Sequence, residues 1–328
     1  MAPLTRAIQV ARKADLPGDS DVVRYTGKTD PEWVVRRVPN GGYTLSLIVQ
    51  ACIENQAGSE HPDPLHVSAH YLQATRTATF EVHLRVLKRG RSFINILADL
   101  VQRDRSCITA HLIFGKIPVS TRPLIDFSSG YARRLPHLRH PSEAVVTRMY
   151  DEVFGFSHRI RWATDPYLRS QNKPESPARR VSTGGGMAVW GAWIELVDKD
   201  ERITPASLAF LADCIETMGT LFPKSVTGFD VRNLWLPTLS LSLQWKAPIP
   251  PPSAIHSART VGISVVSGFL SEPQNRHDTL IEIWTAPSNI GEGKPVNGWR
   301  EQQLCLGVAT QMQLMVSSSI NEKSGAKL

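Results

Sequence analysis

The 328-residue sequence has little of several features that would by themselves define a class of protein. Its four cysteines each stand alone among apolar neighbours with no C-x-x-C pair. This pattern argues against disulfides and zinc sites, and it predicts buried, reduced thiols. No apolar run approaches the roughly 18 residues of a membrane span, and the N-terminus has no signal-peptide core. We therefore expect a soluble, intracellular chain without a membrane span, a metal or a cofactor.

Signals for nucleotides and nucleic acids are also sparse. The glycine-rich run at 182–186 lacks a lysine and the G-x-G-x-x-G spacing, so it predicts a hinge rather than a phosphate loop. Neither zinc spacing nor interleaved basic and aromatic residues point to a nucleic acid partner. The net charge is +7, and positive residues cluster in the middle of the chain, at Arg133, Arg134, Arg139, Arg148, Arg179 and Arg180. These arginines fit either a solvated connector or a region that attracts the phosphates of coenzyme A.

The composition is typical of a globular protein, and one predicted helix is distinctive. Hydrophobic residues make up 41% and charged residues 20%, and the length suits one large domain or two halves. Residues 204–219 read as a helix with Thr204 as N-cap, Pro205 at the first position and Gly219 as the stop. Asp213 lies beside its apolar stripe. A carboxylate in such a place must be paired, reach water, or serve a function.

An earlier segment resembles this helix. Residues 51–54 and 213–216 share Cys-Ile-Glu after their first position, which is Ala51 in one copy and Asp213 in the other. The chain therefore reads as an internal duplication. If both helices hold the same structural place, packing accepts an alanine there, and the acid needs another explanation.

The order of predicted elements repeats as well. A helix at 43–57, opened by Asn40-Gly41-Gly42, follows strands at 21–27 and 32–38. Four predicted strands follow this helix, at 65–72, 78–88, 92–102 and 107–115. Five more lie before and after the second helix, at 187–197, 235–246, 258–270, 279–286 and 302–316. The proline-rich connector between the halves has one further predicted strand within 153–164. The alternation in these strands predicts an α+β protein in which each antiparallel sheet wraps around one enclosed helix. We expect one repeat with its connector in residues 1–150 and the other in residues 151–328.

Several of these motifs carry a family resemblance. The first half has VPNGGYTLSLIVQA at 38–51, and the second has LAFLADCIE, LPTLSLSLQWKAP at 236–248 and LGVATQMQLMV at 306–316. These resemble the acyl-CoA thioesterases of the double hotdog fold, of the bacterial acyl-CoA thioesterase II type, with peroxisomal and fungal relatives. The resemblance implies two tandem hotdog repeats, an acyl-CoA or other acyl thioester as substrate, and a homo-oligomer.

In that family an aspartate, a threonine or serine and a glutamine hold a water molecule, and these roles fall on Asp213, Thr238 and Gln311. Ser240 or Ser242 on the same predicted strand is an alternative to Thr238. An ionised aspartate can take a proton from water, while the hydroxyl and the amide can orient it or polarise the thioester. The second half would therefore carry the catalytic residues, with no cysteine or serine nucleophile.

Asn40, Gly41 and Gly42 are candidates for substrate binding. Backbone N–H groups at a helix start can stabilise a developing oxyanion. The alternative is a turn that needs glycine for its backbone angles.

The last three residues, Ala326-Lys327-Leu328, resemble a peroxisomal address of the S-K-L type that is read by an import receptor. We expect a peroxisomal protein, or otherwise a cytoplasmic one. Three functions remain open: hydrolysis of acyl-CoA, release or transfer of a polyketide-type acyl group in a biosynthetic pathway, and acyl-CoA binding without catalysis.

Overall fold

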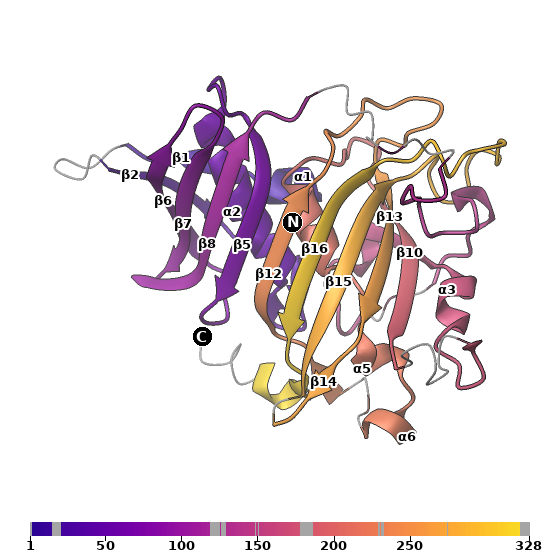
Figure 1. The fold of residues 1–328 in the computed structure, drawn as a ribbon. Coiled ribbons are helices and arrows are strands. Elements are labelled where there is room, and N and C mark those ends of the chain that lie inside the picture. The colour runs from indigo at the N-terminus through magenta and orange to yellow at the C-terminus, as the bar shows by residue number, and fades with distance from the viewer. Residues whose placement is uncertain are drawn as a thin grey trace.

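The fold is seen in a computed structural model that describes residues 2–14, 21–118, 125, 129–147, 149, 151–177, 186–228, 230, 233–273 and 275–321. Two halves lie side by side, and each has a curved antiparallel sheet with a helix against its inner side (Figure 1). The elements follow the order that the sequence predicts.

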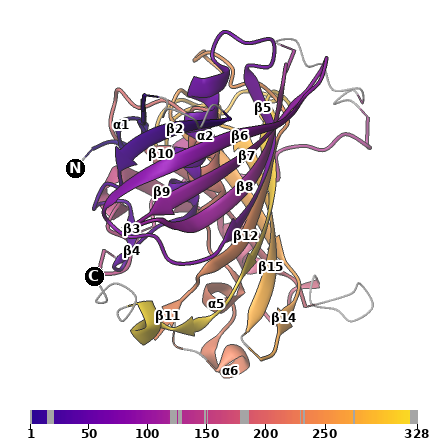
Figure 2. The ribbon, with the colours of Figure 1, turned by 90° about the vertical axis from the view of Figure 1, so that its left-hand side faces the viewer.

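The first half is built around helix α2, Gly41–Gln56, which is buried along most of its length. Asn40 caps this helix by accepting a hydrogen bond from the Tyr43 N–H at 2.8 Å. Five strands pair in the order β2-β6-β7-β8-β5, and their bounds are Val22–Lys28, Thr79–Arg89, Ile94–Gln102, Arg105–Gly115 and Asp63–Tyr71. Figure 2 shows these strands curling over α2. Buried and half-buried residues alternate strictly in β7, as expected for a sheet with one face on the core.

The second half repeats this plan around helix α4, Ser207–Asp213. Its strands pair in the order β12-β16-β15-β13-β10-β9, with bounds Thr238–Trp245, Cys305–Gln313, Arg276–Thr285, Thr260–Ser267, Ala188–Leu196 and Ile160–Thr164. Smaller elements complete the chain: α1 Leu4–Ala7, β1 Ala11–Arg12, β3 Val34–Val35, β4 Val38–Pro39, η1 Pro141–Glu143, η2 Ser157–Arg159, α3 Pro166–Ser170, α5 Met218–Leu221, α6 Lys224–Thr227, β11 Leu234–Trp235, β14 Leu270–Ser271 and β17 Val316–Ser317.

The two halves share one sheet and one core. Strand β5 pairs antiparallel with β12, with Ala69 opposite Leu241, so the two sheets continue into each other. Helices α2 and α4 pack against each other on the inner side. Trp33, Phe156 and Phe210 add an aromatic cluster in which Trp33 stacks on Phe156 at 5.5 Å and meets Phe210 edge-on at 5.0 Å. This cluster fixes α4 beside the start of α2.

The helix predicted at 204–219 is shorter than expected. It ends at Asp213, because Cys214 leaves the helical region with φ −94° and ψ 71°. It also begins later than predicted, at Ser207 with Ala206 and not Thr204 as its N-cap, although Thr204 Oγ1 accepts a hydrogen bond from the Ser207 N–H at 3.1 Å. Gly219 is not the stop: it lies inside α5, where a Cβ would be 2.4 Å from the Met315 sulfur. Close packing, not helix termination, explains this glycine.

Two further segments differ from the prediction. Residues 32–38 form the start of the small hairpin β3–β4 rather than one strand, and Arg36 turns it with a positive φ of 56°. In segment 153–164 only Ile160–Thr164 is a strand, after the 3-10 turn η2. The other predicted strands agree with the observed ones to within a few residues.

The connector packs on the second half, on the sheet face opposite to the main core. There Leu135, Ala163, Trp193, Trp284 and Ile290 form a second, smaller apolar cluster. Five of the seven tryptophans of the second half are buried, namely Trp162, Trp190, Trp193, Trp245 and Trp284, so most of them serve packing. Three of the four cysteines are buried and Cys305 is half-buried. Within the described residues, no helix has the length and hydropathy needed to cross a membrane.

Candidate active site

Asp213, Thr238 and Gln311 lie in direct contact, although they come from α4, β12 and β16. The Thr238 hydroxyl donates to Asp213 Oδ1 at 3.2 Å. The amide nitrogen of Gln311 donates to the same carboxylate oxygen and, at 2.9 Å, to Thr238 Oγ1. The three residues that the sequence selected from separate motifs therefore form one hydrogen-bonded group.

The other carboxylate oxygen of Asp213 belongs to the first half. Asn40 donates its side-chain amide to Oδ2 at 2.9 Å, and Gly42 donates its backbone N–H at 2.8 Å. Of the predicted substrate-binding residues, Asn40 and Gly42 thus hold the carboxylate. The Gly42 N–H does not point at an open oxyanion position. Among the described residues, the N–H of Gly41 makes no hydrogen bond, so it remains the donor available at this helix start.

A close helix contact makes this arrangement possible. A Cβ on Gly42 would lie 2.5 Å from the Ala209 carbonyl oxygen and 2.5 Å from Asp213 Cβ. One turn further along α2, the Ser46 hydroxyl accepts a hydrogen bond from the Phe210 N–H at 3.1 Å. Glycine is therefore required at position 42 because the backbones of α2 and α4 touch there.

A β-bulge decides which hydroxyl of β12 reaches the site. Thr238 lies opposite Gln313 and Ser240 opposite Met312, so two steps along β12 match one step along β16. Successive side chains alternate between faces, and without the extra residue Thr238 would share the outer face of Ser240 and Ser242. Ser242 instead donates to Ser68 on the neighbouring strand at 3.1 Å. Thr238, and neither serine, contacts Asp213.

Electrostatics favour a basic carboxylate. Burial raises the pKa of Asp213 above its ordinary value, while the hydrogen bonds from Gly42, Gln311, Thr238 and Asn40 act in the opposite direction. Both Asp213 and Thr238 are half-buried rather than sealed. A carboxylate with a raised pKa that solvent can approach is suited to accept a proton.

Gln311 has one unused polar atom. Its side chain is 3% exposed, and its carbonyl oxygen Oε1 is buried with no hydrogen-bond partner among the residues described. Such atoms are rare in folded proteins and often mark a site of function. Oε1 is thus an acceptor next to the Asp213 carboxylate.

The sequence prediction missed Tyr71, the last residue of β5. Its hydroxyl donates to the Gly41 carbonyl oxygen at 2.9 Å. Burial and the neighbouring Asp213 raise the pKa of Tyr71 well above its ordinary value, so it stays a neutral donor. A tyrosine at the end of a predicted strand gave no signal of this role, because the join between β5 and β12 brings it to the site.

No group of three or more His, Cys, Asp or Glu side chains in the described part of the chain is arranged to hold a metal ion. Residues 322–328, with the C-terminal tripeptide, and Ser182-Thr183-Gly184-Gly185 lie outside the described residues. The peroxisomal address and the hinge therefore stay predictions.

Known structures share this architecture from end to end. A protein of Thermobifida fusca YX provisionally assigned as a thioesterase II superposes with a TM-score of 0.68 at 18% identity, covering 96% of this chain and 98% of its own. The acyl-CoA thioesterase II of Mycobacterium marinum gives a TM-score of 0.62 at 11% identity, with coverage of 96% and 98%. A hot dog fold protein of Alicyclobacillus acidocaldarius gives 0.64 at 14%, with coverage of 95% and 97%. The chain has the double hotdog fold.

Sequence comparison adds a match within the first repeat. Residues 29–115 match the sequence model of the acyl-CoA thioesterase N-terminal domain. A curated relative, the ustilagic acid biosynthesis cluster protein orf2 of Mycosarcoma maydis, is 26% identical over 165 residues. That match spans 45% of this chain and 43% of the relative. The first repeat thus matches an acyl-CoA thioesterase domain, and the whole chain has the double hotdog fold.

Proposed function

We propose that the chain hydrolyses acyl-CoA thioesters to a free acid and coenzyme A, with Asp213 as general base. One observation carries this proposal: the reactive atoms of Asp213, Thr238 and Gln311 meet within 3.2 Å, at the place where the helices of the two repeats touch. All three residues come from the second half, and Asn40 and Gly42 of the first half hold the Asp213 carboxylate.

In the proposed reaction, a water molecule bound beside the three residues donates one hydrogen to the Asp213 carboxylate and the other to Gln311 Oε1. Asp213 takes the proton as the water oxygen attacks the thioester carbonyl carbon, and Thr238 keeps the carboxylate in place. The Gly41 N–H stabilises the oxyanion, and the tetrahedral intermediate collapses to release the thiolate of coenzyme A, which is then protonated. General base catalysis of this kind contributes roughly 10² to 10⁴ fold.

The first test is an assay of free coenzyme A release from a panel of medium-chain, long-chain and aromatic acyl-CoAs. We expect turnover by the wild type and a loss of about 10² to 10⁴ fold in kcat for Asp213→Asn, which keeps the shape of the side chain. Arg133→Gln, a change on the far face of the sheet, is the matched control and should keep full activity. Saturable acyl-CoA binding without turnover would replace the hydrolase with a binding module.

A second candidate keeps the site and changes the pathway. The relative from Mycosarcoma maydis is named for a biosynthetic cluster, which favours release or transfer of an elaborate acyl group. Activity that is confined to carrier-bound or elaborate thioesters, and absent with simple acyl-CoAs, would select this candidate. For both candidate functions, Asp213→Asn should abolish the activity.

A further inference from the structure

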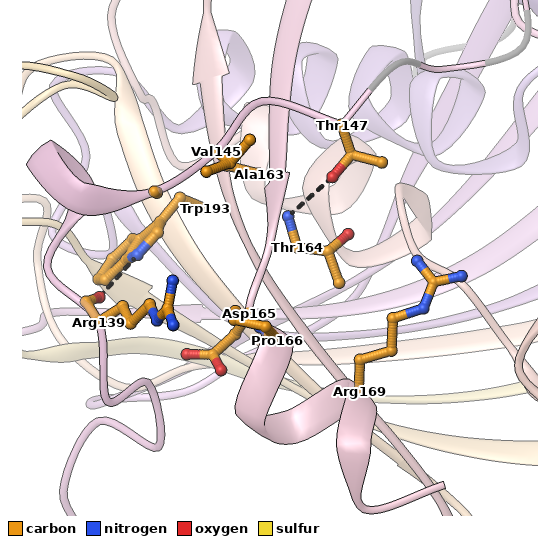
Figure 3. Close-up of a pocket in the computed structure, with 10 residues that line it drawn as sticks. Arg139, Val145, Thr147, Ala163, Thr164, Asp165, Pro166, Arg169 and Trp193 are labelled. Atoms are coloured by element: carbon orange, nitrogen blue, oxygen red, sulfur yellow. Dashed lines mark hydrogen bonds between the residues drawn. The ribbon is translucent and has the colours of Figure 1, made fainter. Parts of the chain in front are cut away.

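A cavity of about 260 Å³ lies on the face of the sheet opposite to Asp213 (Figure 3). It is lined by Trp193 of β10, by Thr164 at the end of β9, and by Arg139 and Thr147 of the connector. Trp193 belongs to the small apolar cluster under the connector, whereas the Asp213 helix lies in the main core. The cavity is therefore separate from the candidate active site.

Two arginines stand on either side of this cavity. Arg139 comes from the connector and Arg169 from α3, and both are exposed. Within the part of the chain that the structure describes, neither has a carboxylate within 4.0 Å. Burial raises the pKa of Glu216, and the charge of Arg169 partly offsets this effect from further away. By contrast, Arg133 of the same basic cluster is paired with Glu282 at 2.8 Å. Arg139 and Arg169 keep their donors for another anion.

The polar groups between the arginines are donors too. Thr147 Oγ1 accepts from the Thr164 N–H at 3.4 Å, and Thr164 Oγ1 accepts from the Trp162 indole at 3.1 Å. The Thr147 hydroxyl thus keeps its hydrogen for a ligand. The buried Asp165 carboxylate is already satisfied by three backbone N–H groups, those of Tyr167, Leu168 and Leu138.

The remaining lining is apolar and fixed. The Trp193 indole donates to the Arg139 carbonyl oxygen at 3.0 Å and packs on His137 at 4.6 Å. Burial lowers the pKa of His137 to about 4, so this ring is neutral and adds no charge. With Val145 and Ala163, Trp193 gives one side of the cavity a hydrophobic surface. Among the described lining residues there are two arginines and one aspartate, so this lining carries one positive charge in excess.

We propose that this cavity binds a small organic monoanion, a carboxylate with a short aliphatic or aromatic body. The carboxylate lies between Arg139 and Arg169 and accepts from the Thr147 hydroxyl, and its apolar body lies on Trp193. The volume lies below the roughly 300 Å³ at which sites for drug-sized ligands begin, which favours a small ligand over a nucleotide. The Asp165 charge disfavours a phosphate dianion more than a monoanion. The ligand has the chemistry of a released acid, but the site stands apart from Asp213.

Calorimetric titration of the full chain with hexanoate, phenylacetate, 2-phenylethanol and inorganic phosphate tests this site. The double variant Arg139→Gln, Arg169→Gln removes both charges and keeps two amides. We expect hexanoate or phenylacetate to bind the wild type, and affinity to fall about tenfold or more in the double variant, because two charge-assisted hydrogen bonds are lost. Arg133→Gln, which removes an arginine outside the cavity, should bind like the wild type.

Equal carboxylate binding by the wild type and the double variant would overturn the proposal, since the acid would then occupy the site of Asp213 or another place. Binding of 2-phenylethanol as tight as that of phenylacetate, or of phosphate alone, would contradict the monoanion. No binding of either carboxylate would overturn it as well. Release of coenzyme A should be unchanged in the double variant, so failure of the hydrolase proposal and failure of this one give different results.

Discussion

Gly42 donates its backbone N–H to Oδ2 of Asp213 at 2.8 Å, across 171 residues of sequence. The helix start of the first repeat thus holds the carboxylate at the helix end of the second. The site therefore depends on the contact between the repeats, which explains why a chain with two similar halves has one acidic centre at this junction.

The first prediction compares the two adjacent glycines. Gly42→Ala should lose most activity and destabilise the fold by about 1–3 kcal/mol or more, because its Cβ would overlap Asp213 Cβ and the Ala209 carbonyl. Gly41→Ala should be milder, since its nearest neighbours are Asp213 Oδ2 at 3.2 Å and Thr238 Oγ1 at 3.3 Å. Chemical denaturation and coenzyme A release check both variants. Equal stability losses would contradict the contact.

The second prediction concerns the hydroxyl of β12. Thr238→Val should lower kcat by about tenfold or more, because the hydroxyl that binds Asp213 Oδ1 is lost, and Thr238→Ser should keep most activity. Ser242→Ala is the matched control on the same strand, since its hydroxyl bonds to Ser68. If Ser242→Ala lowered kcat as much as Thr238→Val, the assignment from the bulge would be wrong.

The third prediction is a pH dependence. Asp213 must be ionised to act as a base, and its pKa is raised by burial, so kcat/KM should fall as the pH drops through a value above that of an ordinary carboxyl. The free energy of unfolding should change with pH in the direction opposite to kcat/KM. Because the folded pKa lies above the unfolded one, the folded state binds more protons in this window, and the free energy of unfolding should decrease as the pH rises through it.

A pH series of rates and of urea unfolding curves measures both effects. The acidic limb of the rate profile should disappear together with most of the activity in Asp213→Asn, and the matching slope in stability should flatten. An acidic limb at the ordinary carboxyl value would show that desolvation does not control this group.

Much of the fold could be predicted, because periodicity and repeated motifs are local signals. The choice of Asp213, Thr238 and Gln311 came from the family resemblance; the structure brings the three into contact, and their catalytic role stays a prediction. Phe80, Val82 and Leu84 alternate as a strand should, and β6 is a strand there. The end of α4 at Asp213 could not be predicted, since the apolar stripe continues to Met218 while the backbone leaves the helical region at Cys214. The bulge at Thr238 and the place of Tyr71 depend on pairing between strands distant in sequence, which no single segment encodes.

The last prediction concerns Asn321, at the end of the described chain. This side chain is fully buried: its amide donates to the Val35 carbonyl oxygen at 3.3 Å, and its oxygen accepts from the Arg37 N–H at 3.3 Å. Both partners lie in the β3–β4 hairpin, which leads directly into Asn40. The C-terminal segment after Gln311 thereby braces the loop that presents Asn40 to Asp213.

Asn321→Ala removes the hydrogen bonds to the Val35 carbonyl and the Arg37 N–H, so we expect a loss of about 1–3 kcal/mol in the free energy of unfolding. We also expect kcat to fall several-fold at temperatures where the variant is fully folded, with KM changed less, because Asn40 is misplaced. Ser319→Ala, an exposed change in the same segment, is the control. If Asn321→Ala were destabilised but kept the wild-type kcat, the brace would serve the fold alone and not the position of Asn40.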